Sequence, residues 1–237
     1  MNLGLKSVSD EFNSGTLGKQ WSWVRENTSN WSLSKKSGSL QITSEKGDIV
    51  ATNNNAKNIL LQSANTDWTI ESKMVCSRKP IGSTQNAGIL AYQDDDDFVK
   101  FVYKATPARR GMGGPPAATP AVQSGTVDII VESNGSQKTA ATLSLTDIIK
   151  DNNTLFLKID KKGSVYTASC SSDGKSFKVV GTADIMLKDV KAGITVCDGV
   201  APAGRGNFPG MQPQAAQPET PFDVAFDYFH ITNKGSK

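Results

Sequence analysis

The fold is decided by the stretch Phe222-Asp223-Val224-Ala225-Phe226-Asp227-Tyr228-Phe229-His230-Ile231, close to the C-terminal end of the chain. Apolar residues stand at every second position, which is the pattern of a strand with one buried face and which places His230 beside Phe226 and Tyr228. A terminal strand frays unless a sheet holds it, and the segment Asp10-Glu11-Phe12 begins the other end of the chain. We therefore expect the two ends to pair inside one closed β-sandwich.

Short alternating strands recur along the rest of the chain. They are predicted over residues 68–76, 87–93, 98–103, 126–132, 154–160, 165–170, 177–180 and 192–197. Asn134-Gly135 follows one of them and is a strong hairpin signal. The succession predicts an all-β chain, a two-sheet antiparallel β-sandwich of the jelly-roll kind. A single helical turn is expected over 145–150.

The composition excludes several classes of function. The 237 residues fit one domain over 1–237, and 26 basic against 23 acidic residues leave a net charge of only +3. This charge gives no footprint for nucleic acid, and no apolar run reaches the roughly 18–20 residues that span a bilayer. Residues 1–6 lack the apolar core of a signal peptide. Either the protein is cytoplasmic, or a signal or a neighbouring domain has been removed. We favour the second alternative and expect an extracellular or periplasmic protein.

Cysteine and histidine offer few options for chemistry. Cys76, Cys170 and Cys197 show no CxxC spacing, and an odd number argues against a full disulfide framework. We expect three small buried side chains, while one bridge between Cys170 and Cys197 stays open. His230 is the only histidine, which rules out a multi-histidine zinc site.

Two long segments interrupt the strand pattern, over residues 105–125 and 199–221. Both are rich in Pro, Gly and Ala, and they contain Arg109 and Arg205. Connections of this length inside a compact domain are usually functional or disordered. They are either solvated loops or rim loops that meet each other or a partner, since arginine pairs well with hydroxyls and carboxylates.

Several short motifs follow one another in a distinctive order. They are Trp21-Ser22-Trp23-Val24-Arg25-Glu26-Asn27, Trp31-Ser32-Leu33, residues 38–42, residues 56–62, Ala87-Gly88-Ile89, Tyr92-Gln93-Asp94, residues 166–174 and Phe226-Asp227-Tyr228-Phe229. Their order resembles that of the concanavalin A-like C-terminal domains of family 43 β-xylosidases, over nearly the whole chain. The resemblance implies a sandwich that accompanies a five-bladed catalytic propeller, supports its active site or binds sugar, and does not itself cut. This chain has no propeller, and its two Pro/Gly loops depart from the family.

The acidic residues form no evident catalytic pair on one strand. A retaining glycosidase needs two carboxyl groups about 5–5.5 Å apart, and an inverting one about 6.5–9.5 Å. Asp128 and Glu132 are four residues apart on one predicted strand, which is roughly 13 Å, and Asp223 and Asp227 have the same spacing. A pair formed across strands would still make the chain a glycosidase or lyase on a concanavalin-like scaffold.

Carboxylates at two places are candidate ligands for calcium, which prefers clusters of oxygen ligands. The run Asp94-Asp95-Asp96-Asp97 is either a solvated hairpin turn or a cation site. By analogy with jelly-roll domains that bind sugar, a structural calcium ion is also expected where the two ends of the chain meet. Its ligands there would be Asp10 or Asp227 together with backbone carbonyls.

Sugar binding needs flat aromatic faces and planar polar groups. The predicted carbohydrate-binding residues are Trp21, Trp23, Gln62, Gln93, Tyr103 and Arg109. At least one of Trp21 and Trp23 should face a surface or groove, because both lie in a polar segment, whereas Trp31 and Trp68 are expected to pack. The amides can both donate to and accept from hydroxyls.

Three functions are compatible with these sequence features. The first is a non-catalytic sandwich that binds a plant-type, xylan-like polysaccharide or supports a neighbouring glycoside hydrolase. The second is an enzyme with acids supplied across strands. The third is a protein-interaction module that uses the two proline-rich loops.

Overall fold

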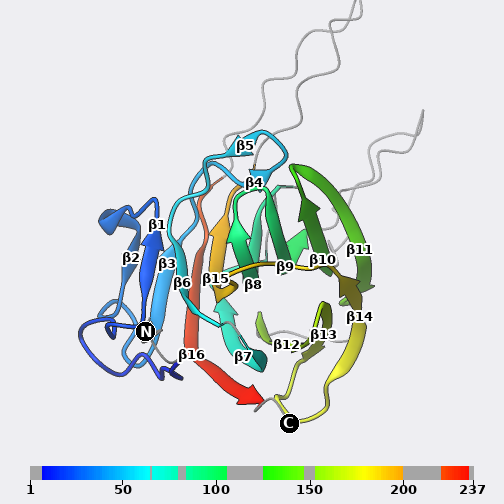
Figure 1. Cartoon of the computed structure of the whole chain (residues 1–237). Coiled ribbons are helices and arrows are strands. Elements are labelled where there is room, and N and C mark those ends of the chain that lie inside the picture. The colour runs from blue at the N-terminus through cyan, green and yellow to red at the C-terminus, as the bar shows by residue number, and fades with distance from the viewer. Residues whose placement is uncertain are drawn as a thin grey trace, which may run out of the picture.

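A computed structural model describes residues 7–64, 66–79, 84–105, 125–146, 153–199 and 220–234, and nearly all of its regular structure is β-strand (Figure 1). The elements are β1 (Ser22–Val24), η1 (Thr28–Asn30), β2 (Trp31–Ser32), β3 (Leu40–Thr43), β4 (Ile49–Val50), β5 (Asn53–Asn54), β6 (Ile59–Ser63), β7 (Asp67–Cys76), β8 (Asn86–Asp94), β9 (Asp97–Ala105), β10 (Gly125–Ser133), β11 (Ser136–Ser144), β12 (Thr154–Lys162), β13 (Val165–Ser171), β14 (Lys178–Asp184), β15 (Lys191–Cys197) and β16 (Asp223–Lys234). None of the described elements is a helix long and apolar enough to cross a bilayer.

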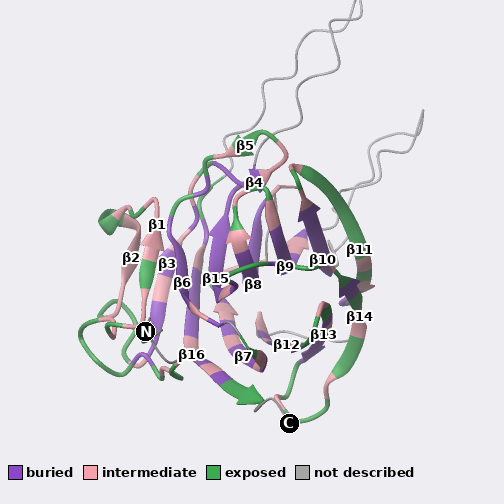
Figure 2. Ribbon diagram, in the orientation of Figure 1, coloured by how far each residue is buried: buried purple, intermediate pink, exposed green. Residues whose placement is uncertain are grey.

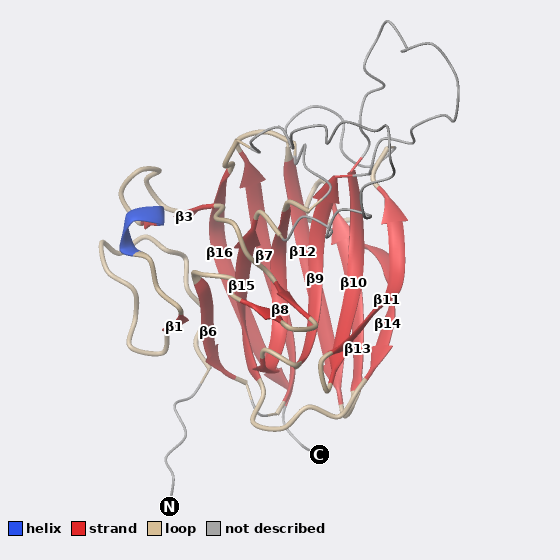
Figure 3. Cartoon of the chain, turned by 90° about the horizontal axis from the view of Figure 1, so that it is seen from above, coloured by secondary structure: helices blue, strands red, loops and turns tan. Residues whose placement is uncertain are grey.

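Two seven-stranded sheets pack face to face (Figures 1 and 3). The first sheet has the order β1-β6-β15-β8-β9-β10-β11, and the second has the order β14-β13-β12-β7-β16-β3-β2. A separate ribbon consists of β4 and β5. All pairs between these strands are antiparallel. The predicted all-β sandwich is therefore confirmed.

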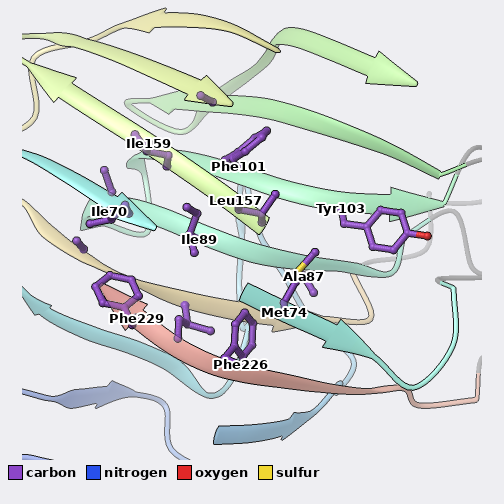
Figure 4. Close-up of a cluster of buried hydrophobic side chains, with 14 of the residues drawn as sticks. Ile70, Met74, Ala87, Ile89, Phe101, Tyr103, Leu157, Ile159, Phe226 and Phe229 are labelled. Atoms are coloured by element: carbon purple, nitrogen blue, oxygen red, sulfur yellow. The ribbon is translucent and has the colours of Figure 1, made fainter. Parts of the chain in front are cut away.

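The main core lies between the two sheets and follows the alternation of the strands (Figure 2). In β7 every second side chain is buried along the whole strand. Ile70 and Met74 from this strand meet Ile89 and Phe101 of the first sheet (Figure 4). Trp68 is fully buried, as predicted. A smaller cluster covers the other side of the first sheet, beneath the segment that carries β4 and β5.

The predicted hairpin at Asn134-Gly135 joins β10 to β11. Both turn residues adopt positive φ angles, 49° for Asn134 and 70° for Gly135. Two consecutive residues of this kind match the right-handed twist of the flanking strands. The local sequence therefore favours this connection, and the neighbouring turn supports it, because the Asn134 amide donates to Asp97 Oδ1 and the Gly135 amide donates to the Asp96 carbonyl, both at 3.1 Å.

The two ends of the chain meet, as expected from the terminal strand. Asp10 and Phe229 exchange two backbone hydrogen bonds, of 2.9 Å and 2.8 Å. Strand β16 lies between β7 and β3 within the second sheet. The C-terminal strand is thus paired on both sides and also holds the N-terminal segment.

The alternation predicted for the C-terminal strand is interrupted by a β-bulge. The register between β16 and β7 shifts between Phe226 and Tyr228, so that Asp227 is the extra residue. Phe226 is fully buried, whereas Tyr228 and His230 are only half-buried on the opposite face. The prediction that His230 shares a face with Phe226 is therefore wrong, because a bulge changes the phase of a strand.

All three cysteines are buried and free, as expected of small core residues. Cys170 lies on β13 of the second sheet, and Cys197 lies on β15 of the first. The bridge left open between these two residues does not form. Burial raises the thiol pKa of Cys76 and Cys197 to about 12 and that of Cys170 to about 11.

The two long Pro/Gly loops and most of the expected helical turn over 145–150 lie outside the described residues. The strand ends on both sides of the first loop and the strand end before the second loop lie at one end of the first sheet. Ala105 pairs with Gly125, and the neighbouring row joins Lys104 to Asn86 and Asn86 to Cys197. Both loops therefore leave the sandwich from the same end.

Candidate functional site

Two tryptophans close one edge of the sandwich. Trp23 lies on β1, the outermost strand of the first sheet, and Trp31 lies on β2, the outermost strand of the second. Their ring centroids are 5.0 Å apart, and both side chains are only partly buried. The Trp31 indole also donates a hydrogen bond of 3.1 Å to Glu26 Oε1. Trp23 thus packs against Trp31 and the core while remaining partly exposed, and its predicted contact with sugar stays a prediction.

Trp21 is separated from this edge and ties the two ends of the chain together. Its indole nitrogen donates to Asp10 Oδ2 at 2.8 Å. The ring stacks on Phe12, with centroids 6.1 Å apart, and meets Phe229 edge-on at 5.2 Å. These contacts make the packing of the N-terminal segment the main role visible for Trp21.

The two predicted calcium ligands are surrounded by hydrogen-bond donors. Asp10 also accepts from the backbone amide of Phe12 at 2.8 Å. Asp227 forms an ion pair of 2.5 Å with Lys73 and accepts from the Ser39 hydroxyl at 3.0 Å. A hard cation prefers six to eight oxygen ligands. Within the described ranges, no group of three or more His, Cys, Asp or Glu side chains is arranged to hold a metal ion. Asp10 and Asp227 thus act as acceptors of hydrogen bonds and an ion pair within the protein. The binding of calcium at these residues stays a prediction.

The predicted amides occupy two different positions. Gln62 is buried and forms a two-way bond with the backbone of Val8, at 2.8 Å and 3.0 Å. Gln93 accepts from the backbone amide of Lys188 at 2.8 Å and donates to Asp94 at 3.0 Å. The structure therefore uses Gln62 to hold the N-terminal segment, whereas Gln93 lies partly buried near the end of β8.

Tyr103 lies in the core, where only 1% of its surface is exposed. Its ring packs so closely over Gly125 that a Cβ at this glycine would overlap it. Burial raises the pKa of the phenol well above its usual value. Arg109 and Arg205 lie outside the described residues, so their predicted contacts with hydroxyls stay predictions.

The run of four aspartates forms the predicted hairpin turn between β8 and β9 and is bonded within the protein. Both oxygens of Asp95 pair with the Arg25 guanidinium, at 2.7 Å and 2.9 Å, and Tyr92 donates its hydroxyl to Asp95 at 2.8 Å. Asp96 accepts from the Asn54 amide at 2.8 Å. These donors stabilise the closely spaced carboxylates.

A buried polar cluster on the outer side of the first sheet escaped prediction from the sequence. Lys100 is fully buried, and its ammonium lies 2.5 Å from Asp48 Oδ1. Asn86 donates to the other oxygen of Asp48 at 3.0 Å. Glu132 accepts a hydrogen bond from the Ala51 amide through Oε2, whereas its Oε1 has no partner. Burial raises the pKa of Glu132. The available signal was the presence of charged residues, Lys100 and Glu132, within the otherwise apolar strands β9 and β10.

A set of aromatic and charged side chains on the outer face of the second sheet was also missed. Residues paired across antiparallel strands share one face of the sheet. Two neighbouring rows of such partners cross strands β16, β7 and β12. The residues of these rows, called the cross-strand platform below, are His230, Glu71 and Lys158 in one row and Tyr228, Lys73 and Phe156 in the other. Alternation alone predicts which residues of β7 and β12 point outward, but the rows depend on the order of the strands.

Hydrogen bonds and stacking connect the platform side chains. The Tyr228 hydroxyl donates to Glu71 Oε1 at 2.8 Å, and Lys158 Nζ lies 3.0 Å from Glu71 Oε2. The His230 ring stacks on Tyr228 with centroids 4.0 Å apart. Partial burial and the bond to Glu71 raise the pKa of Tyr228. The phenol therefore remains protonated and keeps donating at neutral pH.

The sequence of the chain matches a known protein family. A family model described as the Beta xylosidase C-terminal Concanavalin A-like domain matches residues 9–232. The chain belongs to this family. The resemblance found in the sequence is thereby confirmed, and the chain corresponds to the C-terminal domain of family 43 xylosidases. No curated protein matches it.

Solved structures share the fold of this xylosidase C-terminal domain. The GH43 protein BlXynB from Bacillus licheniformis is 20% identical with a TM-score of 0.70, covering 95% of this chain and 39% of that one. Xylan beta-1,4-xylosidase from Bacillus halodurans C-125 is 15% identical with a TM-score of 0.66, covering 96% and 39%. The chain thus spans about two fifths of these enzymes. A functionally unknown protein from Saccharomyces cerevisiae, 16% identical with a TM-score of 0.61, is covered over 98% of its length by 92% of this chain.

Proposed function

We propose that this domain is a non-catalytic accessory module that binds a xylan-like polysaccharide for a glycoside hydrolase. The observation that carries the proposal is the family match over residues 9–232. One similar structure is titled as a xylan beta-1,4-xylosidase, which supports xylan as the first ligand class to test. The partly buried tryptophans at the sandwich edge supply aromatic surface of the kind that packs against sugar rings.

A role without cleavage agrees with the positions of the acids on β10. Asp128 and Glu132 share one face of this strand and are both buried. Four strand residues separate their Cα atoms by roughly 13 Å, which exceeds the spacing in retaining or inverting glycosidases, at most about 9.5 Å. The aspartates in the turn between β8 and β9 are engaged by Arg25 and Asn54 instead.

A catalytic propeller in the same chain is not a requirement of the fold. The Saccharomyces cerevisiae protein is covered over 98% of its length, so a sandwich of this type makes up nearly a whole chain there. The proposed binding role therefore does not depend on a propeller in the same chain. We also propose an extracellular or periplasmic location, because such ligands occur outside the cytoplasm.

The test is binding of the purified domain to xylan, cellulose and other insoluble polysaccharides and to a glycan array, with product analysis on the same samples. Binding without released sugar is expected. Released oligosaccharides would overturn the non-catalytic assignment and favour the enzyme. Absence of both would favour an interaction module that uses the two Pro/Gly loops.

The variants Trp23→Ala and Met186→Ala refine the binding test. Met186 is 77% exposed and follows β14, which lies at the opposite edge of the second sheet from Trp31 on β2, so its replacement is the control. If Trp23→Ala unfolds the domain, the residue is a core residue. If the variant folds and binds normally, the tryptophan edge is not a ligand site.

A further inference from the structure

We infer that the cross-strand platform is a binding site for an uncharged polysaccharide of pyranose sugars, lying across strands β16, β7 and β12. The inference rests on the proposed function and adds a surface that contains none of the predicted carbohydrate-binding residues. Neither the family match nor the similar structures assign a role to these six side chains.

The geometry of the platform suits an extended ligand. The rows run perpendicular to three neighbouring strands, and strands spaced about 4.8 Å apart make each row roughly 10 Å long. Tyr228 and Phe156 stand at the two ends of one row. Side chains that rest on paired strands are held more firmly than side chains on loops. The platform therefore holds two aromatic groups at a fixed separation, Tyr228 stacked on His230 and Phe156 packed against Gly174.

The charges of the platform favour a neutral ligand. Glu71 pairs with Lys158 at 3.0 Å, and Lys73 pairs with Asp227 at 2.5 Å. His230 lies 2.6 Å from Glu11 Oε1. Each charged group of the two rows thus faces an acidic or basic neighbour, and the surface presents no field of a single sign. An anionic polymer would meet no excess of positive charge here, in contrast to a nucleic acid site.

The polar groups are ordered but still reachable. The side chains of Glu71 and Lys158 are each 24% exposed, and that of His230 is 42% exposed. Lys158 Nζ also lies 3.5 Å from the centre of the Phe177 ring, which holds the lysine from the side of β14. Groups already fixed by partners lose less side-chain freedom when a ligand binds. The free lone pairs of the Glu71 carboxylate remain able to accept from sugar hydroxyls.

The single histidine provides a direct reporter of this surface. Because His230 is the only histidine in the chain, the imidazole C–H signals of an untagged sample in proton NMR come from this ring alone, and the Cε1–H resonance is the signal to follow. Neutral xylo-oligosaccharides and cello-oligosaccharides are expected to shift this signal in a saturable manner. Anionic oligogalacturonides, as the comparison, are expected to leave it in place.

Variants complete the test with affinity measured by calorimetry. Tyr228→Ala is expected to weaken binding about tenfold, as for a central aromatic contact, and Tyr228→Phe is expected to weaken it less because the ring is kept. Met186→Ala is the control. Melting temperatures establish whether each variant folds. If Tyr228→Ala does not fold, the imidazole signal of the unmodified chain still shows whether the glycan binds at the platform.

The outcomes separate the two proposals. If the unmodified chain binds neutral glycans while the imidazole signal does not move, the platform is not the site and the proposed function stands. If the unmodified chain binds no glycan, both proposals fail.

Discussion

Phe226 and Phe229 both face the core of the sandwich, although two residues separate them on β16 (Figure 4). In a regular strand these positions would lie on opposite faces. The bulge at Asp227 adds one residue between Phe226 and Tyr228 relative to the neighbouring strand β7. Without this residue the remaining sequence alternates regularly. The bulge is therefore an insertion of one residue, and all remaining side chains of the strand keep their orientation toward the core or the solvent.

Deletion of Asp227 is therefore expected to keep the fold. The loss of its contacts with Lys73 and Ser39 should lower the free energy of unfolding by about 1–2 kcal/mol. Deletion of Ser72, from the regular strand β7, is expected to prevent folding, because a slip of one residue moves side chains to the wrong face. Circular dichroism and urea denaturation measure both. Unfolding of the Asp227 deletion would contradict this view of the bulge.

The tryptophan edge should contribute to stability whether or not it binds a ligand. Trp31→Ala is expected to lower the free energy of unfolding by about 2–3 kcal/mol, less than for a fully buried tryptophan. A double-mutant cycle with Trp23→Ala should give a coupling of about 0.5–1.5 kcal/mol for the two rings. Urea titrations with Met186→Ala as control provide the values, and additive effects of the two substitutions would show that the rings do not interact.

Two glycines offer a matched test of close packing. A Cβ at Gly88 would overlap the carbonyl oxygen of Phe101 on the adjacent strand, whereas a Cβ at Gly15 would meet nothing within 4 Å. Gly88→Ala should lower the free energy of unfolding by about 1–3 kcal/mol, and Gly15→Ala should change it by less than about 0.5 kcal/mol. Equal effects in thermal or urea denaturation would refute the close approach of β8 and β9.

Glu132 should make stability depend on pH. Burial raises the pKa of this carboxyl in the folded state. A carboxyl group whose pKa is raised by folding stabilises the fold at pH values below its pKa in the unfolded chain. This contribution is lost as the pH rises through its pKa in the folded chain. The stability of Glu132→Gln relative to the parent should therefore increase as the pH rises from about 4 to about 7. Urea unfolding over this range tests it, with the exposed Asp184→Asn as control. A constant difference would argue against burial of the ionised form.

The three buried thiols should be silent in the native protein. Burial holds the pKa of Cys76 and Cys197 at about 12, and the thiolate is the reactive form. Ellman's reagent at about pH 8 is expected to detect no thiol in the folded chain and all three in denaturant. Detection of only one thiol after unfolding would indicate the bridge that the structure lacks.

The strands could be predicted because their signals are local. Period-two alternation in residues 68–76 and the Asn134-Gly135 turn depend on neighbours in sequence, and both were found where expected. The bulge at Asp227 left the hydrophobic pattern almost regular, so its effect on His230 became visible only from the register with β7.

The site residues were harder to predict because their partners are distant in sequence. Gln62 bonds to Val8, and Trp21 contacts both Asp10 and Phe229. No sequence pattern near Gln62 predicts that the N-terminal segment covers this side chain. The platform rows likewise require the order of β16, β7 and β12, which follows from the whole topology rather than from any one segment.

The pairing of the two ends of the chain affects how such a domain can be inserted into other proteins. Beyond the Asp10–Phe229 pairing, the Ser7 hydroxyl donates to Asn233 at 3.0 Å, so entry to and exit from the domain lie side by side. A host protein can therefore carry it as an insertion within a single surface loop, with little distortion of either partner. For the same reason, joining the two ends and opening a hairpin elsewhere should yield a circular permutant that still folds.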